Sequence, residues 1–174
     1  FHNTVSLDNF LSFCLAQKLL ERGRLLLHAS SAIVDGKAWL FMGPSGVGKS
    51  TLCDLLAEQG YPILSGDRLY LYREGDQLMG APSPISIAGF DRHDPRRTYD
   101  SHPVERIFRL EQQNKYFFQY ASPVQIVYEF FRESLCFQPE FIKLEDHFAL
   151  GSQILNAPSV QWARLSYPKN APII

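Results

Sequence analysis

The sequence predicts a mixed α/β fold with a partly antiparallel sheet and flanking helices. Three kinds of segment support this: stretches with apolar residues at helical spacing, short β-branched runs, and Gly-containing turns that join such runs into hairpins. The chain has 174 residues and is 45% hydrophobic, which suits a single compact domain with one core. We therefore expect one domain over residues 1–174. Because it begins with Phe1 and not with methionine, we expect it to be a piece of a longer chain.

The composition argues against several classes of protein. The formal net charge is −1, whereas binding to nucleic acid or to a membrane surface relies on an excess of Lys and Arg. No apolar run approaches the roughly 20 residues that cross a bilayer, and the first residues lack the pattern of a signal peptide. We interpret Cys14, Cys53 and Cys136, which have no metal-ligand spacing, as reduced thiols. These features predict a cytoplasmic protein that binds neither nucleic acid nor membrane.

A helix and a hairpin are expected near the start of the chain. Leucines recur at helical spacing over residues 7–23, and Gly23 can end that helix. Residues 25–43 form two apolar runs joined by Asp35-Gly36, a dipeptide typical of a type I′ turn, which needs positive φ at both central residues. The strand that leads to residue 43 is therefore predicted to be antiparallel to its predecessor.

The same turn predicts the register of the hairpin. A two-residue loop pairs Val34 with Lys37, and continuing without a bulge pairs His28 with Gly43. His28 would then lie beside the first glycine of the motif that follows.

The remaining elements are predicted from periodicity and from turn and cap signals. They are a helix over 49–59, a strand over 62–67, a hairpin of 68–72 with 77–82, a strand over 83–90, a polar loop over 91–103, strands over 104–110 and 115–120, a helix from the capping box at Ser122, a helix over 139–155 and a strand over 159–168.

A phosphate-binding motif follows the hairpin. The residues 43–50, GPSGVGKS, fit the P-loop pattern G-x-x-x-x-G-K-[ST] between a predicted strand and a predicted helix. Glycines let the backbone wrap closely around phosphate oxygens, the helix N-terminus favours the same anion, and the lysine adds a positive charge. The predicted phosphate-binding residues are Gly43, Ser45, Gly46, Val47, Gly48, Lys49, Ser50 and Thr51.

A magnesium site needs oxygen ligands besides the nucleotide phosphates. The Ser50 hydroxyl is one candidate, and Asp67, at the end of a short apolar strand, is the second. An acid at this place can also simply start a turn. We expect Ser50 and Asp67 to hold Mg²⁺.

Two further sets of residues have both a structural and a functional interpretation. His28 is either a core histidine or, through the predicted pairing with Gly43, a neighbour of the phosphates. Arg92, Arg96 and Arg97 lie in the long polar loop, which is either a solvated loop or a lid that brings an arginine to the transferred phosphoryl group.

The segment 28–71, HASSAIVDGKAWLFMGPSGVGKSTLCDLLAEQGYPILSGDRLYL, resembles the catalytic domain of the HPr kinase/phosphorylases and the related serine kinases. It resembles the ATP-dependent phosphoenolpyruvate carboxykinases more distantly. The resemblance implies a phosphoenolpyruvate carboxykinase-like fold, Mg²⁺ and ATP (or pyrophosphate), and transfer of phosphate to a serine-type hydroxyl on a peptide, protein or small molecule. It implies catalytic roles for Lys49, Asp67 and His28, and a homo-oligomer.

The chain departs from that family pattern at two positions. The family carries two adjacent acids after the second strand, but here the pair is Gly66-Asp67, and residue 51 is Thr where the HPr kinases have Glu. These departures put the acceptor and the activity in doubt more than the nucleotide site. Two alternatives remain open. One is a degenerate nucleotide-binding sensor or scaffold domain. The other is a guanylate-type nucleoside-monophosphate kinase, because the segment GPSGVGKSTL also resembles the phosphate loop of those enzymes.

Overall fold

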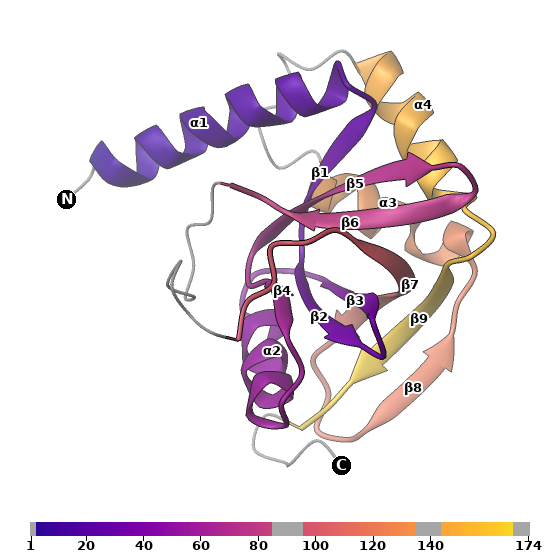
Figure 1. Ribbon diagram of the computed structural model, residues 1–174. Coiled ribbons are helices and arrows are strands. Elements are labelled where there is room, and N and C mark those ends of the chain that lie inside the picture. The colour runs from indigo at the N-terminus through magenta and orange to yellow at the C-terminus, as the bar shows by residue number, and fades with distance from the viewer. Residues whose placement is uncertain (1–2, 85–95, 135–143, 169–174) are drawn as a thin grey trace.

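A computed structural model describes the backbone of residues 3–84, 96–134 and 144–168, and the side chains from residue 10 onward within these ranges. The fold is mixed α/β, with one highly twisted sheet and helices around it (Figure 1), which confirms the predicted class. No helix among the described residues has the length and apolar character needed to cross a membrane.

The strands come in runs that are separated by helices. In order they are α1 (Asn3–Leu20), β1 (Arg24–His28), β2 (Ser30–Val34), β3 (Lys37–Met42), α2 (Lys49–Glu58), β4 (Ile63–Ser65), β5 (Arg68–Glu74), β6 (Gln77–Pro82), β7 (His102–Glu111), β8 (Phe117–Tyr120), α3 (Pro123–Ser134), α4 (Leu144–Leu155) and β9 (Gln161–Ser166).

The sheet is mixed, and β7 is its central strand. Strand β3 runs parallel to β7 on one side, and β9 runs parallel to β7 on the other. The neighbours of β3 and β9 that lie farther out, β2 and β8, are antiparallel to them. The start of β7 also pairs with β6, which continues through β5 to β1 in an antiparallel branch. The sheet therefore splits at β7 into two branches.

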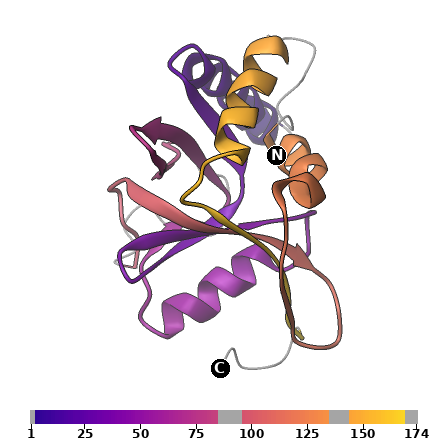
Figure 2. The same ribbon diagram turned by 90° about the vertical axis from the view of Figure 1, so that its right-hand side faces the viewer.

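Helices cover this sheet on opposite sides (Figure 2). Helix α2 packs by Leu52, Cys53 and Leu56 on the face that carries Phe41 and Phe108. Helices α3 and α4 pack on the other face, in a core to which both branches of the sheet contribute. Helix α1 lies outside this core and packs on β1.

The hairpin prediction is confirmed in part. Strands β2 and β3 pair from Val34 with Lys37 to Ser30 with Phe41, and Asp35 and Gly36 both have positive φ. However, the first predicted strand is broken at the fully buried Ala29.

The predicted pairing of His28 with Gly43 is wrong. Residues before Ala29 belong to β1, which leaves β3 for the other branch of the sheet and pairs with β5, so that His28 lies opposite Arg68. The continuous hairpin fails because burial of both apolar runs is satisfied better by two different strand neighbours.

Other elements match the predicted ones with bounds that differ by a few residues, and β7 begins at His102, inside the predicted loop. The capping box at the start of α3 forms, since the backbone N–H of Ser122 donates to the Gln125 side chain at 2.9 Å. The strands predicted over 104–110 and 115–120 exist, and β9 lies between them. The strand predicted over 83–90 and the first half of the 91–103 loop fall largely outside the described residues.

Candidate nucleotide site

The glycine-rich loop connects the end of β3 to the start of α2. Gly43, Gly46 and Gly48 adopt φ of 143°, 78° and 110°, values that favour glycine over any residue with a side chain. A Cβ at Gly48 would lie 2.5 Å from the Tyr167 hydroxyl, and one at Gly43 would lie 3.1 Å from the Leu110 carbonyl oxygen. Both the curl of the loop and its close packing against β7 and the segment after β9 therefore depend on these glycines.

Lys49 is the first residue of α2, and its side chain turns back over the loop. The side chain is largely buried, and its Nζ donates to the carbonyl oxygens of Gly43 at 2.6 Å and Pro44 at 3.4 Å. Ser45, Gly46, Ser50 and Thr51 are exposed around it, whereas Val47 packs into the core on the α2 side. A buried ammonium group beside exposed backbone is the arrangement that binds a phosphate group.

Asp67 lies in the turn between β4 and β5. Three hydrogen bonds hold this turn: Ser65 Oγ donates to Arg68 O at 2.6 Å, the Asp67 N–H donates to Ser65 Oγ at 3.3 Å, and Ser30 Oγ donates to Gly66 O at 2.7 Å. The Arg68 guanidinium lies 3.2 Å from Asp67 Oδ2. The carboxylate of Asp67 is thereby held in place, partly buried, at the end of β4.

His28 reaches Asp67 by a route other than the predicted one. Because β1 pairs with β5, the end of β1 lies beside the start of β5, and His28 Nε2 lies 3.2 Å from Asp67 Oδ1. Hydrogen bonds to Asp67 and then to Glu133 raise the pKa of His28 above its usual 6.5, against burial and the positive charge of Lys49. His28 thus interacts with Asp67 and with the lysine of the loop.

Glu133 is a site residue that our sequence reasoning missed. Its Oε2 lies 2.8 Å from His28 Nδ1, although the two residues are 105 positions apart. Burial opposes ionisation of Glu133, but the hydrogen bonds from His28 and Arg132 prevail and lower the pKa of this carboxyl. The same balance, with His28, Arg68 and Lys49 as the opposing groups, lowers the pKa of Asp67.

The sequence carries one signal that could have found Glu133. In helix α3, Ile126, Glu129, Phe130 and Glu133 stand at i, i+3, i+4 and i+7, so the two acids share one helix face with the fully buried Ile126 and Phe130. Charged residues at helical spacing usually mark a solvated face. Here Glu129 and Glu133 are both buried, which a solvated face does not explain.

A cavity of about 270 Å³ adjoins the loop. It is lined by Pro44, Ser45, Val47, Arg109, Leu110, Glu111, Gln112, Glu129 and Arg132. Arg109 pairs with Glu129 at 2.8 Å, and Arg132 pairs with Glu133 at the same distance. Charged groups from β7 and α3 therefore surround a space next to the first half of the loop. Arg132 lines this space and also pairs with Glu133, the partner of His28.

The donor set fits a magnesium ion held together with nucleotide phosphates. Among the residues that the structure describes, no three His, Cys, Asp or Glu side chains gather as a protein-only metal cluster. Mg²⁺ does not need one, because it keeps several waters and takes one or two protein oxygens in addition to phosphates. The exposed hydroxyl of Ser50 and the carboxylate of Asp67 are oxygen ligands of the required kind.

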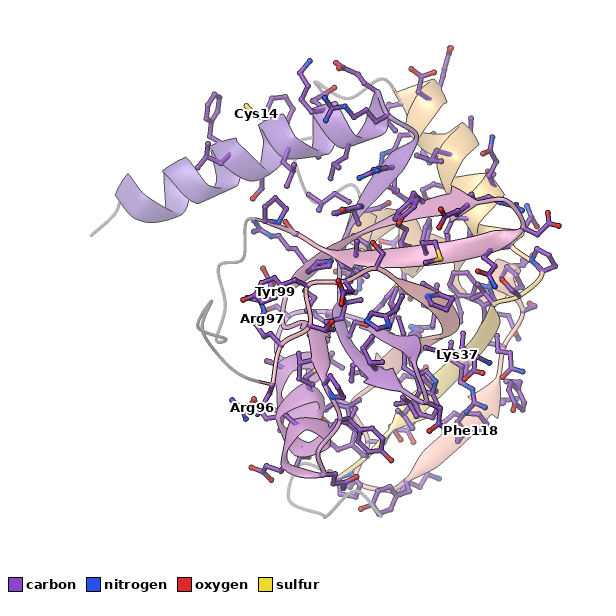
Figure 3. All side chains as sticks on the ribbon, in the orientation of Figure 1. Cys14, Lys37, Arg96, Arg97, Tyr99 and Phe118 are labelled. Carbon is purple, nitrogen blue, oxygen red and sulfur yellow. The ribbon has the colours of Figure 1, made fainter. Side chains whose placement is uncertain are left out.

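Arg96 and Arg97, two of the three predicted lid arginines, do not line this cavity. Arg96 and Arg97 follow the edge of β4, where the Ile63 N–H donates to Arg96 O at 2.7 Å and Ile63 forms a parallel bridge with Arg97. The Arg97 guanidinium lies over the Tyr99 ring, and Figure 3 shows both arginines on the side of the molecule opposite Lys37. Arg92 lies outside the described residues, so the lid stays a prediction.

Comparisons with known proteins agree with the resemblance found in the sequence. No family model matches the chain. The HPr kinase/phosphorylases of Lacticaseibacillus casei (strain BL23) and of Lacticaseibacillus paracasei are each 31% identical to it over 83 residues, 47% of this chain and 25% of the relative. The match thus spans a quarter of the length of these curated relatives.

A solved structure gives a further, looser match. The HPr(Ser) kinase/phosphatase from Coxiella burnetii aligns over 82% of this chain and 85% of that chain, with 14% identity and a TM-score of 0.47. The sequence match to the two curated relatives confirms the resemblance expected from the residues around the loop, and the chain is HPr kinase-like.

Proposed function

We propose that this chain is a Mg²⁺-ATP-dependent kinase that phosphorylates a serine-type hydroxyl on a peptide, a protein or a small molecule. The observation that carries the proposal is that the lysine of the loop lies within electrostatic range of the cluster formed by His28, Asp67 and Glu133. Lys49 lies over the loop, and its charge is felt by His28, Asp67 and Glu133. The similarity to proteins named HPr kinase/phosphorylase supports the same reaction class.

The loop and Lys49 are assigned to the phosphates of the donor. Backbone N–H groups of residues 45–50 and the N-terminus of α2 favour a bound polyphosphate, and Lys49 supplies a positive charge to its β- and γ-phosphates. Phosphoryl transfer depends mainly on such positioning and charge stabilisation. Pyrophosphate offers the same groups to the loop, so it is the alternative donor.

Ser50 and Asp67 are assigned to the metal, which, when bound, neutralises charge on the transferred phosphoryl group. Asp67 is suited to this role because its carboxylate is ionised and held by His28 and Arg68. His28 in turn places a hydrogen-bond donor next to Asp67, within electrostatic range of Lys49.

The cavity beside Ser45 is assigned to the acceptor. It opens next to the loop, and Arg109, Glu129 and Arg132 supply both charges and donors for a polar group that carries the hydroxyl. An acceptor held there would have its hydroxyl close to the donor phosphates, which is the positioning that phosphoryl transfer requires.

A second candidate is a nucleotide-binding sensor domain without phosphoryl transfer. Gly66 favours it, because the turn before β5 then offers Asp67 as its one acid. A kinase and a sensor domain would both bind Mg-ATP, but only the kinase would transfer its phosphoryl group to an acceptor.

Phosphoryl transfer from labelled ATP separates these candidates. The chain is incubated with Mg²⁺, [γ-³²P]ATP and a panel of seryl peptides and small hydroxyl compounds, beside Lys49→Ala and Lys37→Ala. A kinase transfers label in the parent chain and in Lys37→Ala but not in Lys49→Ala. Binding of Mg-ATP without transfer or hydrolysis would support the sensor domain and contradict the kinase.

A further inference from the structure

The ring of His28 lies between two carboxylates that come from distant parts of the chain. Nε2 faces Asp67 Oδ1 at 3.2 Å and Nδ1 faces Glu133 Oε2 at 2.8 Å. We propose that Glu133 is a positioning residue that fixes the His28 ring against Asp67 and so supplies the second carboxylate of the site. This inference rests on the kinase function proposed above.

With both carboxylates ionised, the geometry is satisfied when each ring nitrogen of His28 carries a proton. A carboxylate oxygen that has lost its proton can only accept, so both nitrogens of His28 donate, one to Glu133 and one to Asp67. Hydrogen bonds with a charged partner are short and strong compared with neutral ones. The ring is thereby held at both ends, and a rotation about its bond to Cβ would break both hydrogen bonds.

Glu133 is itself fixed. Its second oxygen, Oε1, accepts from Arg132 Nη2 at 2.8 Å and Nε at 3.1 Å, while Oε2 takes His28. The side chain of Glu133 is only 6% exposed, and Phe130, three residues earlier on α3, is fully buried in the core. The position of this carboxylate therefore follows from the packing of α3 on the sheet.

The turn before β5 explains why a second carboxylate has to come from elsewhere. Residue 66 is glycine, and its carbonyl oxygen accepts from Ser30, so this turn contributes one carboxylate, that of Asp67. Asp67 is oriented by two partners, His28 at Oδ1 and Arg68 at Oδ2. Loss of Glu133 leaves the ring of His28 free to turn away, and Asp67 then loses one of the two groups that orient it.

The effect on activity follows from this indirect role. Removal of a group that orients a metal ligand or a catalytic residue through a hydrogen bond typically lowers activity by about 10–100-fold. Glu133 does not line the cavity, and its effect passes through His28. We therefore expect a change in kcat with little change in the KM for ATP.

The test compares Glu133→Leu, which keeps the side-chain volume but removes the acceptor, with Glu133→Gln, which keeps an acceptor oxygen. Glu105→Leu is the matched control, because Glu105 also accepts two side-chain hydrogen bonds, from Lys37 and Trp39, but belongs to β7 away from the site. Each variant is measured for kcat and KM, and its His28 ring is observed by long-range ¹H–¹⁵N NMR at one fixed pH without nucleotide.

Glu133→Leu should lower kcat by about 10–100-fold with the KM for ATP within about threefold, Glu133→Gln should restore part of the loss, and Glu105→Leu should behave as the parent. Both Glu133 variants should shift the ring nitrogen signals of His28. Unchanged ring signals, or equal losses in kcat for Gln and Leu, would overturn the proposal.

Two further outcomes are also decisive. Should Glu133→Leu fail to fold, Glu133→Gln provides the test: shifted ring signals of His28 would support the proposal, and unchanged signals would overturn it. An inactive parent chain would overturn the kinase function and, with it, the catalytic part of this inference. The ring spectra would still show whether Glu133 holds His28, so the two failures are distinguishable.

Discussion

The hydroxyl of Tyr167 donates a 2.6 Å hydrogen bond to the carbonyl oxygen of Gly48, 119 residues earlier in the chain. Gly48 O also accepts the first helical hydrogen bond of α2, from the Leu52 N–H at 2.9 Å. Tyr167 is largely buried, and this burial raises the pKa of its hydroxyl to about 12. The segment after β9 thus holds the end of the glycine-rich loop in place.

Removing this hydroxyl should weaken the loop without unfolding it. Tyr167→Phe leaves Gly48 O with Leu52 as its partner, so we expect a loss of about 1 kcal/mol in the free energy of unfolding and a Kd for Mg-ATP a few-fold higher. Urea unfolding and calorimetric titration measure the two effects. Tyr120→Phe, at an exposed tyrosine, is the control; an equal effect in both variants would contradict the role given to Tyr167.

The assignment of Asp67 to the metal predicts a change in magnesium dependence. Asp67→Asn keeps the size of the side chain but removes the charge, so the Mg²⁺ concentration for half-maximal ATP binding should rise by at least about tenfold. Titration of Mg²⁺ at constant ATP measures this change. Asp76→Asn, in the exposed turn between β5 and β6, is the matched control; an unaltered magnesium dependence in Asp67→Asn would remove Asp67 from the metal site.

The buried ring of His147 should make the fold less stable in weak acid. Its ring is buried and lies 2.9 Å from Ser134 Oγ, and burial lowers its pKa from 6.5 to about 4. Between pH 6.5 and pH 4 the ring of His147 is protonated in the unfolded chain but not in the folded one, so the free energy of unfolding falls as the pH is lowered. His28 has the opposite sign, since its raised pKa gives stability that is complete below 6.5 and is lost above it.

Urea unfolding at pH 6.5 and pH 5 tests this assignment. We expect the parent chain to lose about 1–2 kcal/mol over this interval. His147→Gln, which cannot take up the proton, should lose much less over the same interval. Equal losses in the two proteins would show that His147 does not carry this pH dependence.

The local parts of the site could be predicted from the sequence, because they depend on neighbouring residues. The turn at Asp35-Gly36 needs positive φ, which fixed the register of β2 with β3, and the glycine spacing predicted the loop between β3 and α2. The capping box at Ser122 predicted the start of α3 in the same way. Each of these signals acts within a few residues.

The partners of His28 could not be predicted, because they depend on tertiary packing. The chain moves from one branch of the sheet to the other at Ala29, and the apolar residues on both sides of Ala29 carry no sign of this change. Glu133 comes close to His28 only through the packing of α3 on the core. The spacing of Glu133 with the apolar residues of α3 was visible in the sequence, but its partner, 105 residues away, was not.

The central claim is that the loop with Lys49 binds a nucleotide, and calorimetric titration of Mg-ATP tests it most directly. The control for Lys49→Ala is Lys37→Ala, since Lys37 is a half-exposed lysine paired with Glu105 at the opposite end of β3 (Figure 3). We expect the parent chain and Lys37→Ala to bind with micromolar to millimolar affinity, and Lys49→Ala to bind at least about tenfold more weakly. A folded parent chain that binds neither Mg-ATP nor Mg-pyrophosphate, or equal binding by Lys49→Ala, would contradict it.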